Sequence, residues 1–512
     1  MSAALLSAAL LTLAQSPFSI GIFALFALVP WLRATHYAGR GEAAVLGALV
    51  GTTHGCLLGI WGLEALRALG SSSVHAVFGV VTIAAWGKGI PFALLGIAMH
   101  STRERGRGWQ VFSAGAAFYI VEIWISNWYM GVPLGLMGHS QLEVGGVAQL
   151  ALVGGVPLIS GLLAAVNMAL NVAWNEKGER GALVAPAALF AAWGALVFVG
   201  LPVARWARPQ PASSPEPPQS ILIVQPNLVR AERWLDDHQP LHLKLMVEYT
   251  ARALGELKRD PGVVIWPENM VTAPVDDSPA LASQLQGGVD LLGVPVITGA
   301  VRSARSGASD RYRNSVLWLS PGEGVRASID KVLAVPALET ALSGWGEPLA
   351  EWAFEGPSRL PQVEEAEFAG PLRADFVVTA ILCYEALFPG LVSERTSKDS
   401  LAIVNLADDS WIPGDVADSQ LLAASAFRAI EQRLTLIRVS HGGLSVVLDP
   451  FGIEVASLPP NQFAHMFVSV SKSPPPTLLE KVAILAIPVS VALVVWTSLK
   501  ARRRRPTAEL RQ

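Results

Sequence analysis

The apolar residues of this 512-residue chain lie in two blocks that flank one polar segment. Residues 1–206 are mostly apolar, as is a stretch near 480–498, whereas residues 219–473 have the composition of a soluble domain. Charged residues make up 15% of the chain, and soluble domains usually carry about 25%. The sequence therefore predicts a membrane protein with one inserted soluble domain that is long enough for a large core.

Eight apolar segments are candidates for membrane-spanning helices, because a crossing helix needs about 20 apolar residues. They lie at about 3–16, 18–33, 43–66, 74–99, 109–129, 147–174, 182–205 and 479–499. The first two are short and are separated by Ser16-Pro17, which predicts a helical hairpin. The N-terminus has no basic stretch before its apolar run, so we expect no cleaved signal peptide. Lys88 and Glu122 fall inside predicted helices, where charges are usually functional or paired.

Basic residues predict how these segments cross the membrane. They follow the even-numbered segments. Arg33 and Arg40 follow the second, Arg103, Arg105 and Arg107 the fourth, Lys177 and Arg180 the sixth, and Lys500 with Arg502 to Arg505 the eighth. The opposite loops are poor in basic residues, with Arg67 in one and none in 130–146. Basic loops stay in the cytoplasm. We therefore expect a multi-pass membrane protein whose soluble domain lies outside the cytoplasm, which in a Gram-negative bacterium means the inner membrane and the periplasm.

Proline-rich segments mark the limits of the soluble domain. The segment 208–219 holds five prolines, and Ser473-Pro474-Pro475-Pro476 ends the domain. We predict a bundle of seven helices at 1–207, a linker at 208–219, a catalytic domain at 220–473, and a last helix with a basic cytoplasmic tail at 474–512. Short β-branched strands alternate with helical stretches in 220–473, which predicts an α/β sheet with helical layers.

Three predicted strands of this domain end in a chemically active side chain. Glu268 follows the run 263–267, Lys331 follows 327–330, and Cys383 follows 380–382. A carboxylate, an ammonium and a thiol are the parts of an activated cysteine nucleophile. Glu268 would act as general base and then acid, and Lys331 would stabilise the thiolate and the oxyanion. Taken singly, a free cysteine is more often a small buried hydrophobic residue, but the combination favours catalysis.

Composition excludes several other classes of function. The net charge of −3 gives no support for a nucleic-acid partner. Cys56 lies in an apolar segment and Cys383 in the soluble domain, so a disulfide between them is not expected. Cysteine and histidine residues are not spaced as metal ligands, and no glycine-rich phosphate loop follows a strand. We therefore expect neither a metal nor a cofactor.

The three residues also carry a resemblance to a known family. They occur in Trp-Pro-Glu, Asp-Lys and Cys-Tyr-Glu contexts, in the order that is typical of the nitrilase superfamily. Together with the membrane segments, the chain resembles the apolipoprotein N-acyltransferases. Further matching motifs are Val224-Gln225-Pro226-Asn227 with Trp234, Val335-Pro336 with Glu339, Ser16-Pro17-Phe18, Glu122, Gly131-Val132-Pro133 with Ser140-Gln141, and Arg428, Glu431 and Arg438.

This resemblance implies a fold and an activity. The fold would be a polytopic α-helical membrane bundle of about eight helices plus an α/β nitrilase-like αββα sandwich. The activity would be transfer of an acyl chain from a phospholipid, through a Cys383 thioester, to the α-amine of a diacylglyceryl-apolipoprotein, by a monomer without cofactors. Supporting or substrate-binding roles are then expected for Trp234, Glu339, Tyr384 and Glu385.

Three loops depart from the family pattern. The family's usual Pro-Phe-Gly-Glu is replaced here by Pro336-Ala337-Leu338-Glu339. Its Asn-Asp-x-Trp-Phe is replaced by Asp408-Asp409-Ser410-Trp411-Ile412, and its Asn-Asn-Gly by Ser440-His441-Gly442-Gly443. These loops touch the expected substrate site. Two alternatives therefore stay open, a membrane-tethered amidase of the nitrilase type and a divergent paralogue that serves conjugal transfer.

The stretch 334–358 predicts a lid over the active site. It is rich in Gly, Ala and Leu, shows little helix or strand periodicity, and contains Trp345, Trp352 and Phe354. Because aromatic side chains favour the membrane interface, we expect this lid to face the membrane. The alternative is a loop that packs on its own domain.

Overall fold

The chain divides into two compact units. The computed structural model describes all residues except 69–70, 128–132, 176–182, 209–216, 229–237, 257–260, 305–311, 336–338, 340–365, 411–414 and 504–512. The helical unit consists of Met1–Leu58, Val81–Gln210 and Pro476–Gln512, and the sheet unit consists of Gly59–Val80 and Pro211–Pro475. Within the sheet unit, Trp61 Nε1 donates a hydrogen bond of 3.2 Å to Gln420 Oε1, which ties the short helix α4 (Gly62–Ala68) to α17 (Asp415–Gln432).

Helices account for most of the described chain outside the two sheets. The N-terminal ones are α1 (Ser2–Ala14), η1 (Gly21–Leu25), α2 (Val29–Tyr37), α3 (Arg40–Leu58), α5 (Ser73–Ala84), η2 (Ala85–Gly89), α6 (Ile90–Thr102) and α7 (Arg107–Asn127). They are followed by η3 (Met137–Gln141), α8 (Gly145–Ala148), α9 (Ala151–Asn175), α10 (Val184–Ala195), η4 (Leu196–Gly200), α11 (Leu201–Ala207) and, after the sheets, α18 (Leu478–Arg503).

Four helices in the described part of the chain are long and apolar enough to cross a membrane. They cover Arg40–Leu58, Ser73–Thr102, Ala151–Asn175 and Val184–Ala207. This finding supports a membrane protein, although it does not confirm the predicted count of about eight. The predicted segment 18–33 is not one helix, because η1 precedes α2 and Pro30 lies in the first turn of α2, where its fixed φ favours a helix start.

The two predicted intramembrane charges are both buried and both bind one loop. Lys88 Nζ donates a hydrogen bond of 3.0 Å to the Gly135 carbonyl, and Glu122 Oε1 accepts one of 2.8 Å from the Met137 amide. Their charges also interact with each other. The pair therefore satisfies backbone groups at the start of η3 and in the turn just before it, inside the helical unit, where unpaired polar groups are costly.

The described strands of the sheet unit form two six-stranded sheets. The first has the order β12 (Ala464–Val470), β1 (Gln219–Gln225), β2 (Val263–Ile265), β3 (Val296–Ser303), β4 (Tyr312–Ser320) and β5 (Gly324–Asp330). The second has the order β11 (Glu454–Ser457), β10 (Val446–Leu448), β9 (Thr435–Ser440), β8 (Ser400–Ala407), β7 (Val377–Leu382) and β6 (Leu372–Arg373). Strands β1, β2 and β3 are parallel, as are β7, β8 and β9. The predicted α/β domain is thereby confirmed.

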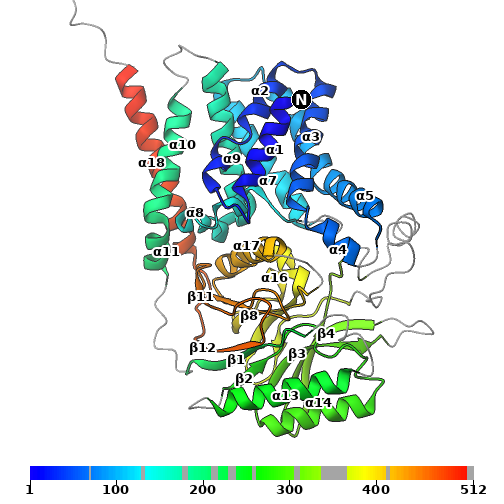
Figure 1. The fold of residues 1–512 in the computed structure, drawn as a ribbon. Helices are drawn as coiled ribbons and strands as arrows, with labels where there is room; N and C mark the ends of the chain where they lie inside the picture. The colour runs from blue at the N-terminus through cyan, green and yellow to red at the C-terminus, as the bar shows by residue number, and fades with distance from the viewer. Residues whose placement is uncertain are drawn as a thin grey trace, which may run out of the picture. The chain divides into compact units, whose positions relative to one another are not determined.

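Alternating side chains of the central strands fill two cores. In β1, Ile221 and Ile223 pack between the sheets, whereas Leu222 and Val224 pack under the outer helices α13 (Gln239–Gly255) and α14 (Pro279–Leu292). A strand segment that is buried on both faces is apolar at successive positions, as residues 221–224 of β1 and all of β2 are. Figure 1 shows α13 and α14 outside the first sheet, and α16 (Pro389–Arg395) with α17 outside the second. The layers are therefore helix, sheet, sheet, helix.

Candidate active site

Strand direction explains why Glu268 and Lys331 come together. Parallel strands end at one edge of a sheet, and Glu268 follows β2 at that edge. Strand β5 runs antiparallel to β4, which runs antiparallel to β3, so β5 also ends there and Lys331 follows it directly. Asn314 lies at the start of β4, at the same edge, and its carbonyl accepts a 2.7 Å hydrogen bond from the Lys331 amide.

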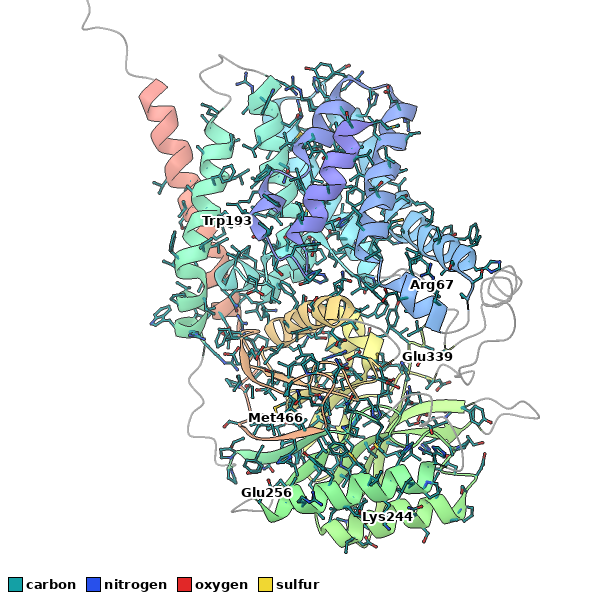
Figure 2. All side chains as sticks on the ribbon, viewed as in Figure 1. Arg67, Trp193, Lys244, Glu256, Glu339 and Met466 are labelled. Atoms are coloured by element: carbon teal, nitrogen blue, oxygen red, sulfur yellow. The ribbon has the colours of Figure 1, made fainter. Side chains whose placement is uncertain are left out.

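Lys331 joins two carboxylates. Its Nζ donates hydrogen bonds of 3.1 Å to Glu268 Oε1 and 2.8 Å to Glu339 Oε1. Glu268 Oε1 also accepts 2.8 Å from Asn314 Nδ2, and Glu339 Oε2 accepts 2.8 Å from the Val335 amide. The Lys331 and Glu268 side chains are only 1% and 2% exposed. Figure 2 shows Glu339 separated from Lys244, on the outer helix α13, by the strands of the first sheet.

Cys383 is the first residue of the short 3-10 helix η5 (Cys383–Leu387), directly after β7. Its backbone has φ = +44°, a left-handed conformation that is uncommon for a residue with a Cβ. The residue is buried, and its thiol lies within electrostatic range of Glu268, Lys331, Asp409 and Arg438. Backbone strain of this kind often occurs at functional sites.

Glu385 and Arg395 fix the two loops that carry Lys331 and Cys383. One Glu385 oxygen accepts hydrogen bonds from the amides of Val332 (2.8 Å) and Leu333 (3.3 Å), which follow Lys331. The other oxygen accepts from the Leu382 amide at 2.9 Å and from Arg395 Nη1 at 2.8 Å. Both ionic side chains are fully buried. Glu385 therefore holds the lysine loop against the cysteine turn.

Burial and neighbouring charges set the proton affinities of the three residues. Burial raises the pKa of Glu268 to about 7; Lys331 opposes this shift, whereas Glu339 and Asp408 add to it. Burial alone would lower the pKa of Lys331, but Glu268, Glu339 and Cys383 hold that pKa well above its ordinary value. Burial raises the pKa of the Cys383 thiol, and the negative charges of Glu268 and Asp409 raise it further. The positive charges of Lys331 and Arg438 counteract this rise. Such a thiol needs a nearby base, and Glu268 can take a proton near neutral pH.

The structure brings most of the predicted site residues into one cluster. Glu268, Lys331 and Glu339 share hydrogen bonds, and Cys383 lies within range of their charges. The ring of Tyr384 is buried against Phe388, with centroids 5.0 Å apart, and burial raises the pKa of its hydroxyl. Trp234 lies outside the described residues, as do the predicted lid aromatics Trp345, Trp352 and Phe354 and the departures 337–338 and 411–412.

Sequence reasoning missed three polar residues of the cluster, namely Asn314, Arg395 and Asn405. Asn314 and Asn405 lie near strand ends, and a polar residue in a buried strand is the signal that could have pointed to them. Arg395 follows Cys383 on a separate helix, and the sequence carries no local signal for its role. In the described residues, no group of three or more His, Cys, Asp or Glu side chains is arranged to hold a metal ion.

Several known proteins with similar sequences bear the same name. Residues 7–169 match the apolipoprotein N-acyltransferase N-terminal domain. A protein from Rhizobium meliloti named apolipoprotein N-acyltransferase is 28% identical over 69% of this chain and 66% of its own length. A protein of the same name from Bradyrhizobium diazoefficiens is 27% identical over 98% of this chain and 94% of its own length.

Among solved structures, an amidase from Nesterenkonia sp. gives a more distant match. The match has 17% sequence identity and a TM-score of 0.36, and it covers 50% of this chain and 91% of the amidase chain. The sequence similarity to the Bradyrhizobium diazoefficiens protein extends through both the apolar segments and the soluble domain. By sequence, the chain is similar to proteins named apolipoprotein N-acyltransferase, and residues 7–169 match the model of their N-terminal domain.

Proposed function

We propose that this chain is an acyltransferase that moves a fatty acyl chain from a phospholipid to the α-amine of the lipid-modified N-terminal cysteine of apolipoproteins. The observation that carries the proposal is the buried Lys331, whose ammonium binds both Glu268 and Glu339 within electrostatic range of Cys383. The name of the related proteins supplies the reaction class and the acceptor.

The first half-reaction transfers the acyl chain to the enzyme. The Glu268 carboxylate takes the proton of the Cys383 thiol, and the thiolate attacks the ester carbonyl of the phospholipid. Lys331 stabilises the oxyanion of the tetrahedral intermediate, because a fixed cation in a buried site interacts strongly with developing negative charge. The C–O bond then breaks, Glu268 returns its proton to the leaving oxygen, and a lysophospholipid departs from the thioester.

The second half-reaction transfers the acyl chain to the acceptor. The neutral α-amine attacks the thioester carbonyl, and Glu268 takes a proton from the attacking nitrogen. The C–S bond breaks, an amide is formed, and the thiolate recovers the proton from Glu268. Because one carboxyl group serves as base and acid in both halves, a pKa near 7 suits its role.

Membrane topology and domain organisation belong to the same proposal. Eight segments cross a bacterial inner membrane, with the bundle at 1–207, the linker at 208–219, the nitrilase-like catalytic domain at 220–473 and the last helix within 474–512. The basic loops lie in the cytoplasm and the catalytic domain lies in the periplasm. The enzyme works as a monomer. Trp234 binds substrate.

Complementation tests this function directly. The chain, or its Cys383→Ala variant, is expressed in a bacterium depleted of its own apolipoprotein N-acyltransferase, and lipoprotein N-termini are analysed by mass spectrometry. We expect wild-type protein to restore growth and to add a third acyl chain, and Cys383→Ala to do neither. Unmodified N-termini beside free fatty acid would instead indicate a membrane-tethered hydrolase. Unmodified N-termini without release of fatty acid would favour a paralogue with a role in conjugal transfer.

A further inference from the structure

A buried polar network outside the proposed triad supports the backbone of Cys383. Asn405 Nδ2 donates a hydrogen bond of 3.3 Å to the Cys383 carbonyl. On the other side of the same amide, Asn405 Oδ1 accepts a hydrogen bond from Arg438 Nη1. Arg438 Nη2 in turn donates 2.8 Å hydrogen bonds to both oxygens of Asp409. Ser440 Oγ completes the network with a 2.8 Å bond to Asp409 Oδ2.

Strand register explains why this network reaches Cys383. In the parallel strands β7, β8 and β9, Ile381 pairs with Asn405, and Asn405 pairs with Arg438. The two polar side chains therefore stand at one level in adjacent strands, two residues before the cysteine turn. Asn405 and Arg438 are 0% and 1% exposed. Fully buried polar groups in central strands are expensive unless every partner is fixed, so their presence calls for a specific role.

The chemistry of the groups fixes the orientation of the Asn405 amide. A guanidinium can only donate, so it must face the amide oxygen, and the NH₂ group is then turned toward the Cys383 carbonyl. The bonds to Asp409 hold the guanidinium itself in place. Cys383 has φ = +44° and follows directly on β7, so its carbonyl needs a firm partner to keep this conformation.

We propose that Asn405 and Arg438 are positioning residues for the nucleophile, which hold the left-handed Cys383 so that its sulfur stays within reach of Glu268 and Lys331. This inference rests on the proposed role of Cys383. The charges that face the thiol are Glu268 after β2, Lys331 after β5, Asp409 after β8 and Arg438 on β9. The last two oppose each other in their effect on the thiol. The network therefore acts through placement of the sulfur more than through net charge.

Two variants of Asn405 separate placement from folding. Asn405→Leu removes both hydrogen bonds, whereas Asn405→Asp keeps the shape and the acceptor for Arg438 but loses the donor to Cys383. Thr379→Val is the matched control, since Thr379 is fully buried on β7 and bonds Ser400 of β8 at 3.0 Å. All are made in full-length protein that also carries Cys56→Ser, so that Cys383 is the remaining thiol.

Two measurements are compared for each variant. Acylation of Cys383 is followed as the burst of p-nitrophenol from a p-nitrophenyl ester, a donor that does not depend on phospholipid recognition. Alkylation by iodoacetamide across pH reports the amount and pKa of the thiol. We expect both Asn405 variants to slow the burst by roughly 100-fold, the scale expected of a misplacement of about 1 Å. Alkylation at high pH should stay within about threefold of wild type, because a small reagent tolerates a misplaced sulfur. Thr379→Val should keep the wild-type burst.

The outcomes separate the possible failures. A wild-type burst in either folded Asn405 variant would overturn the inference. A parallel loss of burst and alkylation, matched by Thr379→Val, would also overturn it, because it would indicate a purely structural role. If Asn405→Leu does not fold, the burst and alkylation measurements on Asn405→Asp alone test the positioning role. If wild-type protein shows the burst but takes no acyl chain from phospholipid, the proposed donor is wrong while the positioning role is still measured.

Discussion

Replacement of Glu339 by glutamine tests the electrostatics of the site most sharply. Glu339 and Glu268 bind the same Lys331 nitrogen, at 2.8 and 3.1 Å. Their oxygens are therefore at most about 6 Å apart, and at an effective dielectric constant of about 20 their repulsion amounts to roughly 3 kcal/mol. This corresponds to roughly two pKa units, and the ammonium between the two carboxylates reduces it. We expect Glu339→Gln to lower the pKa of Glu268 by about one to two units from its value of about 7.

The sign follows from removal of a like charge. Without the Glu339 carboxylate, ionised Glu268 is more stable, so it stays competent as a base at lower pH. The acid limb of the pH profile for Cys383 acylation should therefore move to lower pH, even if the plateau rate falls. Glu323→Gln is the control, because Glu323 is an exposed carboxylate paired with Arg326. An acid limb that stays in place in Glu339→Gln, or that moves to higher pH, would refute the argument.

Three further changes have defined outcomes. Gly299→Ala places a Cβ 2.5 Å from Glu268 Cα and 2.7 Å from the Asn269 amide nitrogen, so the Glu268 backbone must shift. The rate of single-turnover acylation should then fall by at least about tenfold. An unchanged rate would show that the strand end tolerates this displacement. Arg395→Met leaves the fully buried Glu385 carboxylate without its cation. Denaturant titration should then show a free energy of unfolding that is lower by about 3–5 kcal/mol. A loss below about 1 kcal/mol would contradict a stabilising role for this ion pair. Lys331→Met removes a cation that lowers the pKa of the Cys383 thiol, so the pH profile of iodoacetamide alkylation should move to higher pH; a shift to lower pH would show that the ammonium does not face the sulfur.

The sequence could predict which strand ends carry chemistry because the signal is local. An apolar run followed at once by Glu268, Lys331 or Cys383 marks the end of a buried strand, and parallel strands end at one edge. That Glu268 and Glu339 both bind the Lys331 ammonium could be expected only from the resemblance, since no spacing rule links the two glutamates.

The rest of the site depends on register between strands that are distant in sequence. Asn314 reaches Glu268 because Ser315 pairs with Asp330 at the site edge, and Asn405 reaches Cys383 because it pairs with Ile381. Neither pairing can be inferred from a single strand, because a slip of one residue would turn each side chain to the other face. Arg395 acts from a helix whose direction is set by packing on the second sheet.

The membrane segments were predicted less well than the sheets. Hydropathy treats 18–33 as one apolar window, but a new helix begins at Val29 after a 3-10 turn, with Pro30 in its first turn. Helix α7 covers the described part of the predicted segment 109–129, and α18 covers the predicted segment 479–499. Neither helix is among the four that qualify by length and composition in the described chain. Hydropathy reports burial in an apolar medium, which a helix can find in a bilayer or inside a bundle.

Detection of the acyl-enzyme tests the central claim most directly. Full-length protein is incubated with phosphatidylethanolamine of defined chain length, without acceptor, and is then digested and analysed by mass spectrometry. The account predicts that the peptide containing Cys383 gains the mass of that acyl chain, that hydroxylamine removes it, and that Cys383→Ser does not form it under the same conditions. An unmodified Cys383 peptide, together with acyl transfer to an added lipoprotein acceptor, would contradict it.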